Sequence, residues 1–99
     1  MTEPAASIHW RRSSHVAWVA DADRTVVLDV ESDAPEPTAL TGTGAAIWTH
    51  LGADPISLTT IVESLAAEYA VAPEAIRADV EAFLLALQAK GFADSSETD

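Results

Sequence analysis

Side chains suited to acid–base or metal chemistry are few and scattered. The histidines are His9, His15 and His50, and none lies four residues from another, the spacing that lets a helix present two imidazoles to one metal ion. The sequence has no cysteine to complete a ligand set or to act as a nucleophile. No serine stands in a nucleophile-elbow motif. The pattern therefore predicts ordinary surface histidines and no metal centre.

Two further patterns resemble sites but have simpler explanations. Glu74, Asp79 and Glu81 are spaced along one predicted helix, which is typical of a solvated face rather than of a paired general acid and base. The run Gly42-Thr43-Gly44 resembles a piece of a phosphate-binding loop, but the following lysine and the preceding buried strand are missing. We interpret these glycines as a tight entry into a helix. The sequence thus predicts a protein that is not an enzyme and that binds no cofactor.

Acidic residues dominate the charge of the chain. The 16 Asp and Glu residues outnumber the 5 Lys and Arg residues, which gives a net charge of −11. Nucleic acids are held mainly by lysine and arginine contacts to phosphate, so this balance argues against a nucleic-acid partner. An acidic surface suits a basic or amphipathic peptide, and it also serves solubility alone. Both interpretations are open at this stage.

Length and hydrophobicity indicate one small domain. The 99 residues, 48% of them hydrophobic, are enough for a single core. No apolar run approaches the roughly 20 residues of a membrane-spanning helix. The first residues lack the basic and apolar regions of a secretory signal. We expect no membrane partner and a cytoplasmic location.

The first half of the chain is predicted to be rich in β-structure. Residues 1–14 are expected to form an irregular N-terminal arm. Alternating β-branched and aromatic residues predict strands over residues 15–21 and 25–31, joined by a turn into a hairpin. Residues 38–40 can form a short third strand. Because Pro35 and Pro37 precede it, this strand must be an edge, where a missing N–H breaks no ladder bond.

The second half predicts three amphipathic helices and a disordered tail over residues 94–99. Thr41 is expected to cap the first helix through its hydroxyl, and Gly52 to end it in the left-handed conformation. Ser57 is expected to cap the second helix, while Pro73 opens the third and Gly91 ends it. The predicted apolar faces comprise Ile47, Trp48 and Leu51; Leu58, Ile61, Val62, Leu65 and Tyr69; and Ile76, Val80, Phe83, Leu84 and Leu87.

The order of these segments is similar to that of the PqqD-like family, whose members are also called RiPP recognition elements. The resemblance covers residues 15–93. It is carried by His15-Val16, by Val26-Val27-Leu28-Asp29, by Leu40-Thr41-Gly42-Thr43-Gly44-Ala45-Ala46-Ile47-Trp48, by residues 61–74 and by Ala78-Asp79-Val80-Glu81-Ala82-Phe83-Leu84 with Gly91-Phe92. The family's consensus sequence around the first helix is Leu-Asn-x-Thr-Gly-Ala-x-Ile-Trp, and Thr41 here replaces the Asn. The spacing also resembles the stand-alone recognition proteins of lasso-peptide pathways.

The resemblance implies an α+β, winged-helix-like fold: a three-stranded antiparallel sheet followed by three helices. It also implies a non-catalytic adaptor that binds the leader segment of a ribosomally made precursor peptide and presents it to a modifying enzyme, such as a peptidase, a cyclase or a radical enzyme. In the family the leader adds as a strand to the third strand, with its side chains in a groove against the third helix. The peptide-binding residues implied here are Pro37, Thr38, Ala39, Leu40, Arg77, Val80, Glu81, Leu84 and Leu87.

Three points remain open from the sequence. Val80, Leu84 and Leu87 suit core packing as well as a peptide groove. Family members usually have no proline where this chain has Pro35 and Pro37. A winged-helix DNA-binding regulator and a stabilising subunit of a larger enzyme are alternative functions, the first of them opposed by the negative charge.

Overall fold

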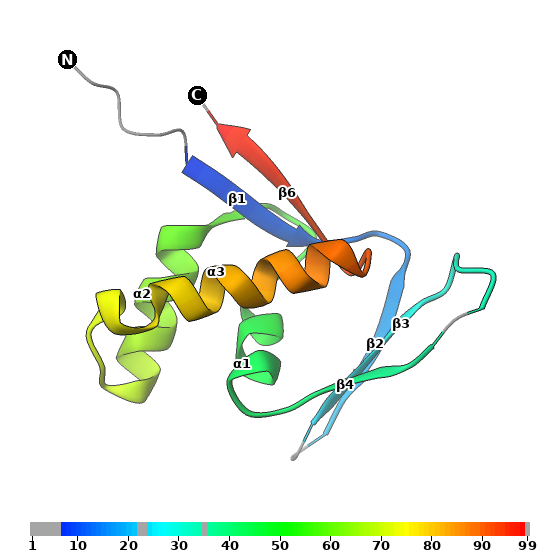
Figure 1. Cartoon of the computed structure of the whole chain (residues 1–99), viewed down its shortest axis with the longest axis horizontal. Helices are drawn as coiled ribbons and strands as arrows, with labels where there is room; N and C mark the ends of the chain where they lie inside the picture. The colour runs from blue at the N-terminus through cyan, green and yellow to red at the C-terminus, as the bar shows by residue number, and fades with distance from the viewer. Residues whose placement is uncertain (1–6, 22–23, 35, 99) are drawn as a thin grey trace.

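The computed structural model describes residues 7–21, 24–34 and 36–98, in two sheets and three helices (Figure 1). Both sheets have three strands, with strand orders β2-β3-β4 and β5-β1-β6. The helices follow one another along the chain after β4. In chain order the elements are β1 (Ser7–Arg12), β2 (Val16–Ala20), β3 (Thr25–Asp29), β4 (Thr38–Leu40), α1 (Gly42–His50), β5 (Ile56–Ser57), α2 (Leu58–Tyr69), α3 (Pro73–Ala89) and β6 (Ala93–Thr98).

The β2-β3-β4 sheet followed by the three helices confirms the α+β fold expected from the sequence. β2 and β3 form the predicted antiparallel hairpin, with Val16 opposite Asp29 and Ala20 opposite Thr25. β4 pairs antiparallel with β3, and Leu40 lies opposite Thr25. The short third strand therefore exists despite the two prolines, because it begins at Thr38, after Pro37.

The second sheet corrects the expectation of an irregular arm and a disordered tail. β1 lies within the expected arm and pairs antiparallel with β6, from Ser7 opposite Thr98 to Arg12 opposite Ala93. The partners are far apart in sequence, and β6 is polar, so neither strand carries a strong local signal. Residues 1–6 of the expected arm and the final residue of the expected tail lie outside the described residues.

Several predicted helix ends are confirmed. The Ser57 side chain accepts a hydrogen bond from the N–H of Thr60 at 3.1 Å, which caps α2. Pro73 occupies the first turn of α3, and Gly91 follows its end with a φ of +82°.

Two expectations about α1 are wrong, and the left-handed conformation of Ala70 was not foreseen. Thr41 is the N-cap, but its side chain makes no capping hydrogen bond. Gly52 does not have a positive φ. The chain leaves α1 in an extended conformation, and the O of Gly52 accepts the N–H of Arg12 at 2.9 Å. Ala70 instead takes the left-handed conformation, at the end of α2.

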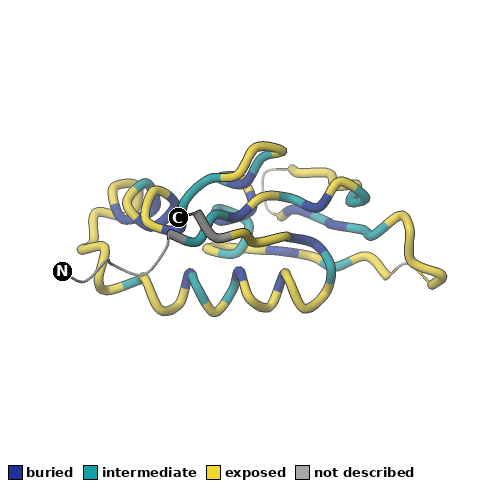
Figure 2. The backbone as a smooth tube through the Cα atoms, turned by 90° about the horizontal axis from the view of Figure 1, so that it is seen from above, coloured by how far each residue is buried: buried dark blue, intermediate teal, exposed yellow. Residues whose placement is uncertain are grey.

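The core lies where the helices meet the sheets, and Figure 2 shows its buried positions alternating with exposed ones along α3. Trp48 is 0% exposed, which confirms core packing for this side chain. Tyr69 is 46% exposed, so its predicted place on the apolar face of α2 is wrong. Within the described residues no helix is long and apolar enough to cross a membrane. The other buried hydrophobic residues include Trp10, Val27, Leu40, Ile47, Leu51, Leu58, Ile61, Val62, Leu65, Val80, Leu84, Leu87 and Phe92.

Candidate functional site

Two hydrogen bonds at the ends of the β2-β3 hairpin show which residues of β3 direct their N–H and C=O groups to β2 and which direct them to β4. The N–H of Asp21 donates to the O of Arg24 at 2.9 Å. At the other end, the N–H of Val30 donates to the O of His15 at 3.0 Å. In an antiparallel ladder every second residue pair exchanges such bonds. Counting along the register from either end, Val26 is a residue that bonds to β2.

The same alternation identifies the residue of β4 that faces away from the sheet. Since Val26 bonds to β2, its neighbours Thr25 and Val27 direct their N–H and C=O groups to β4, where they meet Leu40 and Thr38. Ala39 lies opposite Val26 and directs its own N–H and C=O to the free side of β4. In the described part of the chain no strand pairs with that side. Ala39 therefore offers an unpaired donor and acceptor to an incoming strand.

Side chains of β4 point alternately to the core and away from it. Leu40 is 6% exposed, Thr38 is half-buried, and Ala39 is exposed on the opposite face. On that outer face Val26 pairs with Ala39 and with Val19, which is 72% exposed. An additional strand beside β4 would place alternate side chains on the inner face, next to Thr38 and Leu40.

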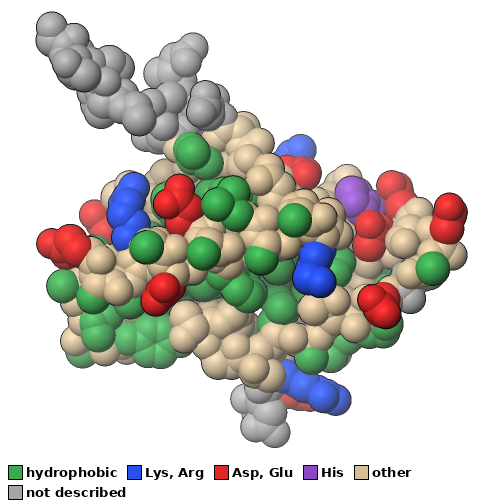
Figure 3. Space-filling model, in the orientation of Figure 1, with side chains coloured by type: hydrophobic (Ala, Val, Ile, Leu, Met, Phe, Trp, Pro, Cys, Tyr) green, Lys and Arg blue, Asp and Glu red, His purple; other side chains and the backbone are tan. Residues whose placement is uncertain are grey.

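The surface between β4 and α3 is hollowed. Figure 3 shows the hollow below α3, beside the segment that carries β4 and α1, with hydrophobic side chains at its bottom. The predicted residues Val80, Leu84 and Leu87 are at most 2% exposed and pack in the core with Leu40. They belong to the core, and their burial gives an incoming side chain no direct access to them.

The remaining predicted residues of α3 lie at its surface. Arg77 is exposed and Glu81 is half-buried. Neither side chain has an ion-pair partner in the described part of the chain. Pro37 is exposed and precedes β4, so it belongs to the approach to the edge rather than to the strand. A contact of these three residues with a peptide stays a prediction.

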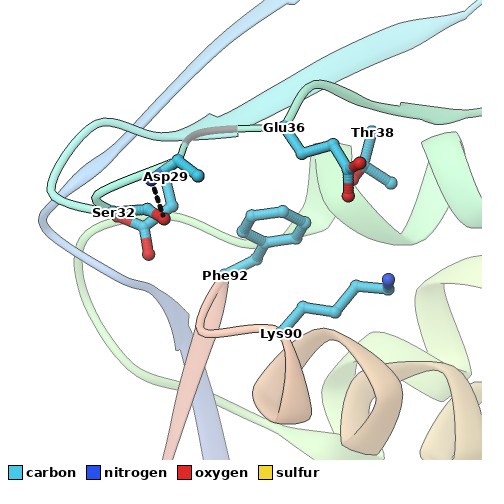
Figure 4. Close-up of a pocket in the computed structure, with 7 residues that line it drawn as sticks. Asp29, Ser32, Glu36, Thr38, Lys90 and Phe92 are labelled. Atoms are coloured by element: carbon cyan, nitrogen blue, oxygen red, sulfur yellow. Dashed lines mark hydrogen bonds between the residues drawn. The ribbon is translucent and has the colours of Figure 1, made fainter.

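A pocket of about 210 Å³ lies where the start of β4 approaches the end of α3, and no sequence pattern predicted it. Figure 4 shows the ring of Phe92 at its centre, with Lys90 reaching across toward Glu36 and Thr38. In the sequence Phe92 stands out only as part of the Gly91-Phe92 family motif, and no pattern singles out Lys90. Both reach the pocket from the turn after α3, which lies close to the start of β4 although the two segments are far apart in sequence. No spacing pattern reveals such a contact. The lining residues are Asp29, Ser32, Ala34, Glu36, Thr38, Lys90 and Phe92.

One carboxylate of this pocket is already engaged. An oxygen of Asp29 (Oδ1) accepts the N–H of Glu31 at 2.9 Å, and the other (Oδ2) lies 3.8 Å from Nε2 of His15. The hydroxyl of Ser32 accepts the N–H of Ala34 at 3.2 Å. These bonds hold the connection between β3 and β4 and leave Lys90, Glu36 and Thr38 as the polar groups that remain available.

A cation–π cluster joins the two sheets behind this site. The guanidinium of Arg12 lies 4.2 Å from the ring centroid of Trp18 and 5.2 Å from that of Trp48. The Nη2 atom of Arg12 donates to the O of Trp48 at 3.0 Å. Burial lowers the pKa of Arg12, since the cluster replaces water around the charge. β1, β2 and α1 are therefore fixed relative to one another by one side chain.

An exposed sheet edge beside a helix and an apolar hollow is an arrangement that can receive an extended peptide. The sequence also matches a known family over this region: residues 24–93 fit the family described as coenzyme PQQ synthesis protein D (PqqD). The chain belongs to this family.

A solved structure shares the fold. It is described as TbiB1 in complex with the TbiA(beta) leader peptide, and it matches with a TM-score of 0.73 and 25% sequence identity. The match covers 90% of this chain and 99% of that one. No curated protein matches the sequence.

Proposed function

We propose that this protein is a non-catalytic adaptor that binds the leader segment of a ribosomally synthesised precursor peptide and presents it to a modifying enzyme. The observation that carries the proposal is the unpaired N–H and C=O of Ala39 on an edge strand beside the hollow under α3. Membership of the PqqD family supports it, as does the similar fold of a protein solved with a leader peptide.

In this mechanism the leader adds as a strand to the free side of β4. One leader residue pairs with the N–H and C=O of Ala39, and its side chain lies on the outer face of the sheet. The two neighbouring leader residues direct their side chains inward, one beside Thr38 and its pocket and the other beside Leu40 and the hollow. Backbone pairing supplies affinity irrespective of sequence, and the inward side chains supply specificity.

Pro37 limits the length of this pairing. In an extended chain every second residue directs its backbone groups to the same side, so Pro37 would be the next residue after Ala39 to face the leader. Proline has no N–H to donate. A leader strand can therefore form its full pair of hydrogen bonds at Ala39 but receives no donor from Pro37. The short backbone edge increases the share of binding that must come from side chains in the hollow and the pocket.

The adaptor is proposed to act in the cytoplasm, where precursor peptides are made, and to hand its guest to a peptidase, a cyclase or a radical enzyme. No observation favours a DNA-binding regulator: α2 and α3 with the turn after α3 carry only Arg77 and Lys90 as cations. No observation favours a purely stabilising subunit either.

The direct test is calorimetric titration of the protein with the leader segment of the precursor peptide encoded beside it. We expect one site with micromolar or tighter affinity, and chemical shifts in NMR spectra that centre on β4 and α3. The absence of heat and of shift changes at millimolar peptide would contradict the proposal.

A further inference from the structure

The pocket beside Thr38 lies where an inward side chain of an added strand would fall. Ala39 forms the hydrogen-bonded pair with the added strand, so the next residue of that strand lies opposite Thr38 and shares its face. Thr38 is itself a lining residue of the pocket. A single guest side chain thus has access to the space between Glu36, Lys90 and the ring of Phe92 (Figure 4).

The pocket offers one cation and one anion that lack partners. In the described part of the chain, the ammonium of Lys90 and the carboxylate of Glu36 make no hydrogen bond or ion pair, and neither does the hydroxyl of Thr38. Lys90 approaches from the end of α3, and Glu36 from the segment that leads into β4. A guest side chain between them is exposed to both charges at once.

This mixed lining disfavours a charged guest of either sign. A guest carboxylate would pair with Lys90 but approach Glu36, and a guest ammonium or guanidinium would pair with Glu36 but approach Lys90. In both cases the guest would bring its charge close to a like charge, which costs free energy. A neutral group with a donor and an acceptor leaves neither charge unpaired.

We propose that this pocket binds the side-chain carboxamide of an asparagine or glutamine in the leader segment, an inference that rests on the function proposed above. The amide oxygen accepts from the ammonium of Lys90, and the amide N–H₂ donates to the carboxylate of Glu36. The methylene stem of the guest side chain lies against the ring of Phe92. Lys90 and Glu36 are therefore specificity-determining residues at one end of the leader site.

The inference can be tested with synthetic leader peptides of the precursor encoded beside this protein. In these peptides each position in turn is replaced by Gln, Glu or Lys. Each set is titrated against the wild-type protein and against Lys90→Ala and Glu36→Ala. Arg11→Ala serves as the control, because it removes an exposed cation of β1, in the other sheet, that does not line the pocket. We expect one position at which Gln binds about tenfold tighter than Glu or Lys, the size of a hydrogen bond to a charged group at a partly exposed site.

That preference should fall below about twofold in both pocket variants and persist in Arg11→Ala. A preference for Glu that disappears in Lys90→Ala, or for Lys that disappears in Glu36→Ala, would overturn the carboxamide assignment. So would leader binding with no position sensitive to Lys90 or Glu36, although the adaptor function would then stand. If no leader copy binds the wild-type protein, the adaptor function and the pocket assignment both fail.

Discussion

The guanidinium of Arg12 lies over the ring of Trp18, 4.2 Å from its centroid, and so connects a strand of one sheet to an edge strand of the other. The same side chain donates to the backbone O of Trp48 in α1. Its stem and charge are half-buried, whereas the neighbouring Arg11 is exposed. The position of the β2-β3-β4 sheet relative to the helices, and with it the position of the free edge at Ala39, therefore depends on Arg12.

Arg12→Ala should lower the free energy of unfolding by about 1–3 kcal/mol, because it removes a charge-assisted hydrogen bond, the cation–π contacts and the packing of the stem. Denaturant unfolding followed by tryptophan fluorescence measures the change. Arg11→Ala is the matched control. Arg11 contacts Asp94 at 3.9 Å with about half of each side chain exposed, so its loss should cost less than about 0.5 kcal/mol. Equal losses in the two variants would refute a special role for Arg12.

Trp48→Ala should destabilise the fold by about 3–5 kcal/mol, since the ring is 0% exposed and packs among core residues of several elements. Thermal and urea unfolding both report the change. Trp48→Phe retains an aromatic ring and should lose less. A Trp48→Ala variant with wild-type stability is incompatible with the core position of this ring.

Gly44 has a packing role that helix propensity alone would not suggest. A Cβ atom at this position would lie 2.9 Å from Cε1 and Cζ of Phe83. Alanine is favoured over glycine inside helices by about 1 kcal/mol, but the clash opposes it by a typical overpacking cost of about 1–3 kcal/mol. We expect Gly44→Ala to be destabilising and the double variant with Phe83→Leu to recover most of the loss.

Gly52→Ala is the control for this comparison. No atom lies within 4 Å of a Cβ built there, and its φ is not positive, so its unfolding free energy should stay within about 0.5 kcal/mol of wild type. A stabilised Gly44→Ala protein would show that the ring of Phe83 moves aside without cost.

Local patterns predicted the elements whose signals are local. The strands around Trp18 and Val27, the cap at Ser57, the start of α3 at Pro73, and the stripe of Val80, Leu84 and Leu87 all follow from spacing and residue type. The stripe did not distinguish a groove from a core, because both require apolar residues at the same positions. Its burial assigns it to the core.

What the sequence did not predict depends on contacts between distant segments. β1 and β6 pair with each other although one lies near the start of the sequence and the other near its end. β6 also contains Ser95 and Ser96 where an alternating apolar pattern would be expected. Gly52 was expected to end a helix in the left-handed conformation, but its O instead bonds to Arg12 of β1. The pocket combines Glu36 and Lys90, which meet only because α3 ends beside the start of β4.

We propose that the leader pairs with the free side of β4 at Ala39. Ala39→Pro removes the N–H that points away from the sheet, so it should weaken leader binding at least about tenfold while the helix content is retained. Ala20→Pro is the matched control. Ala20 and Thr25 form a non-hydrogen-bonded pair, so the N–H of Ala20 points to the free side of β2, which is the opposite edge of the same sheet.

Calorimetric titration of both proline variants with the same leader peptide, after circular dichroism has shown that both are folded, is the most direct measurement. The predicted result is a loss of affinity in Ala39→Pro and unchanged affinity in Ala20→Pro. Unchanged affinity in Ala39→Pro would exclude pairing of the leader with β4 at Ala39, and a loss confined to Ala20→Pro would place the leader on β2 instead.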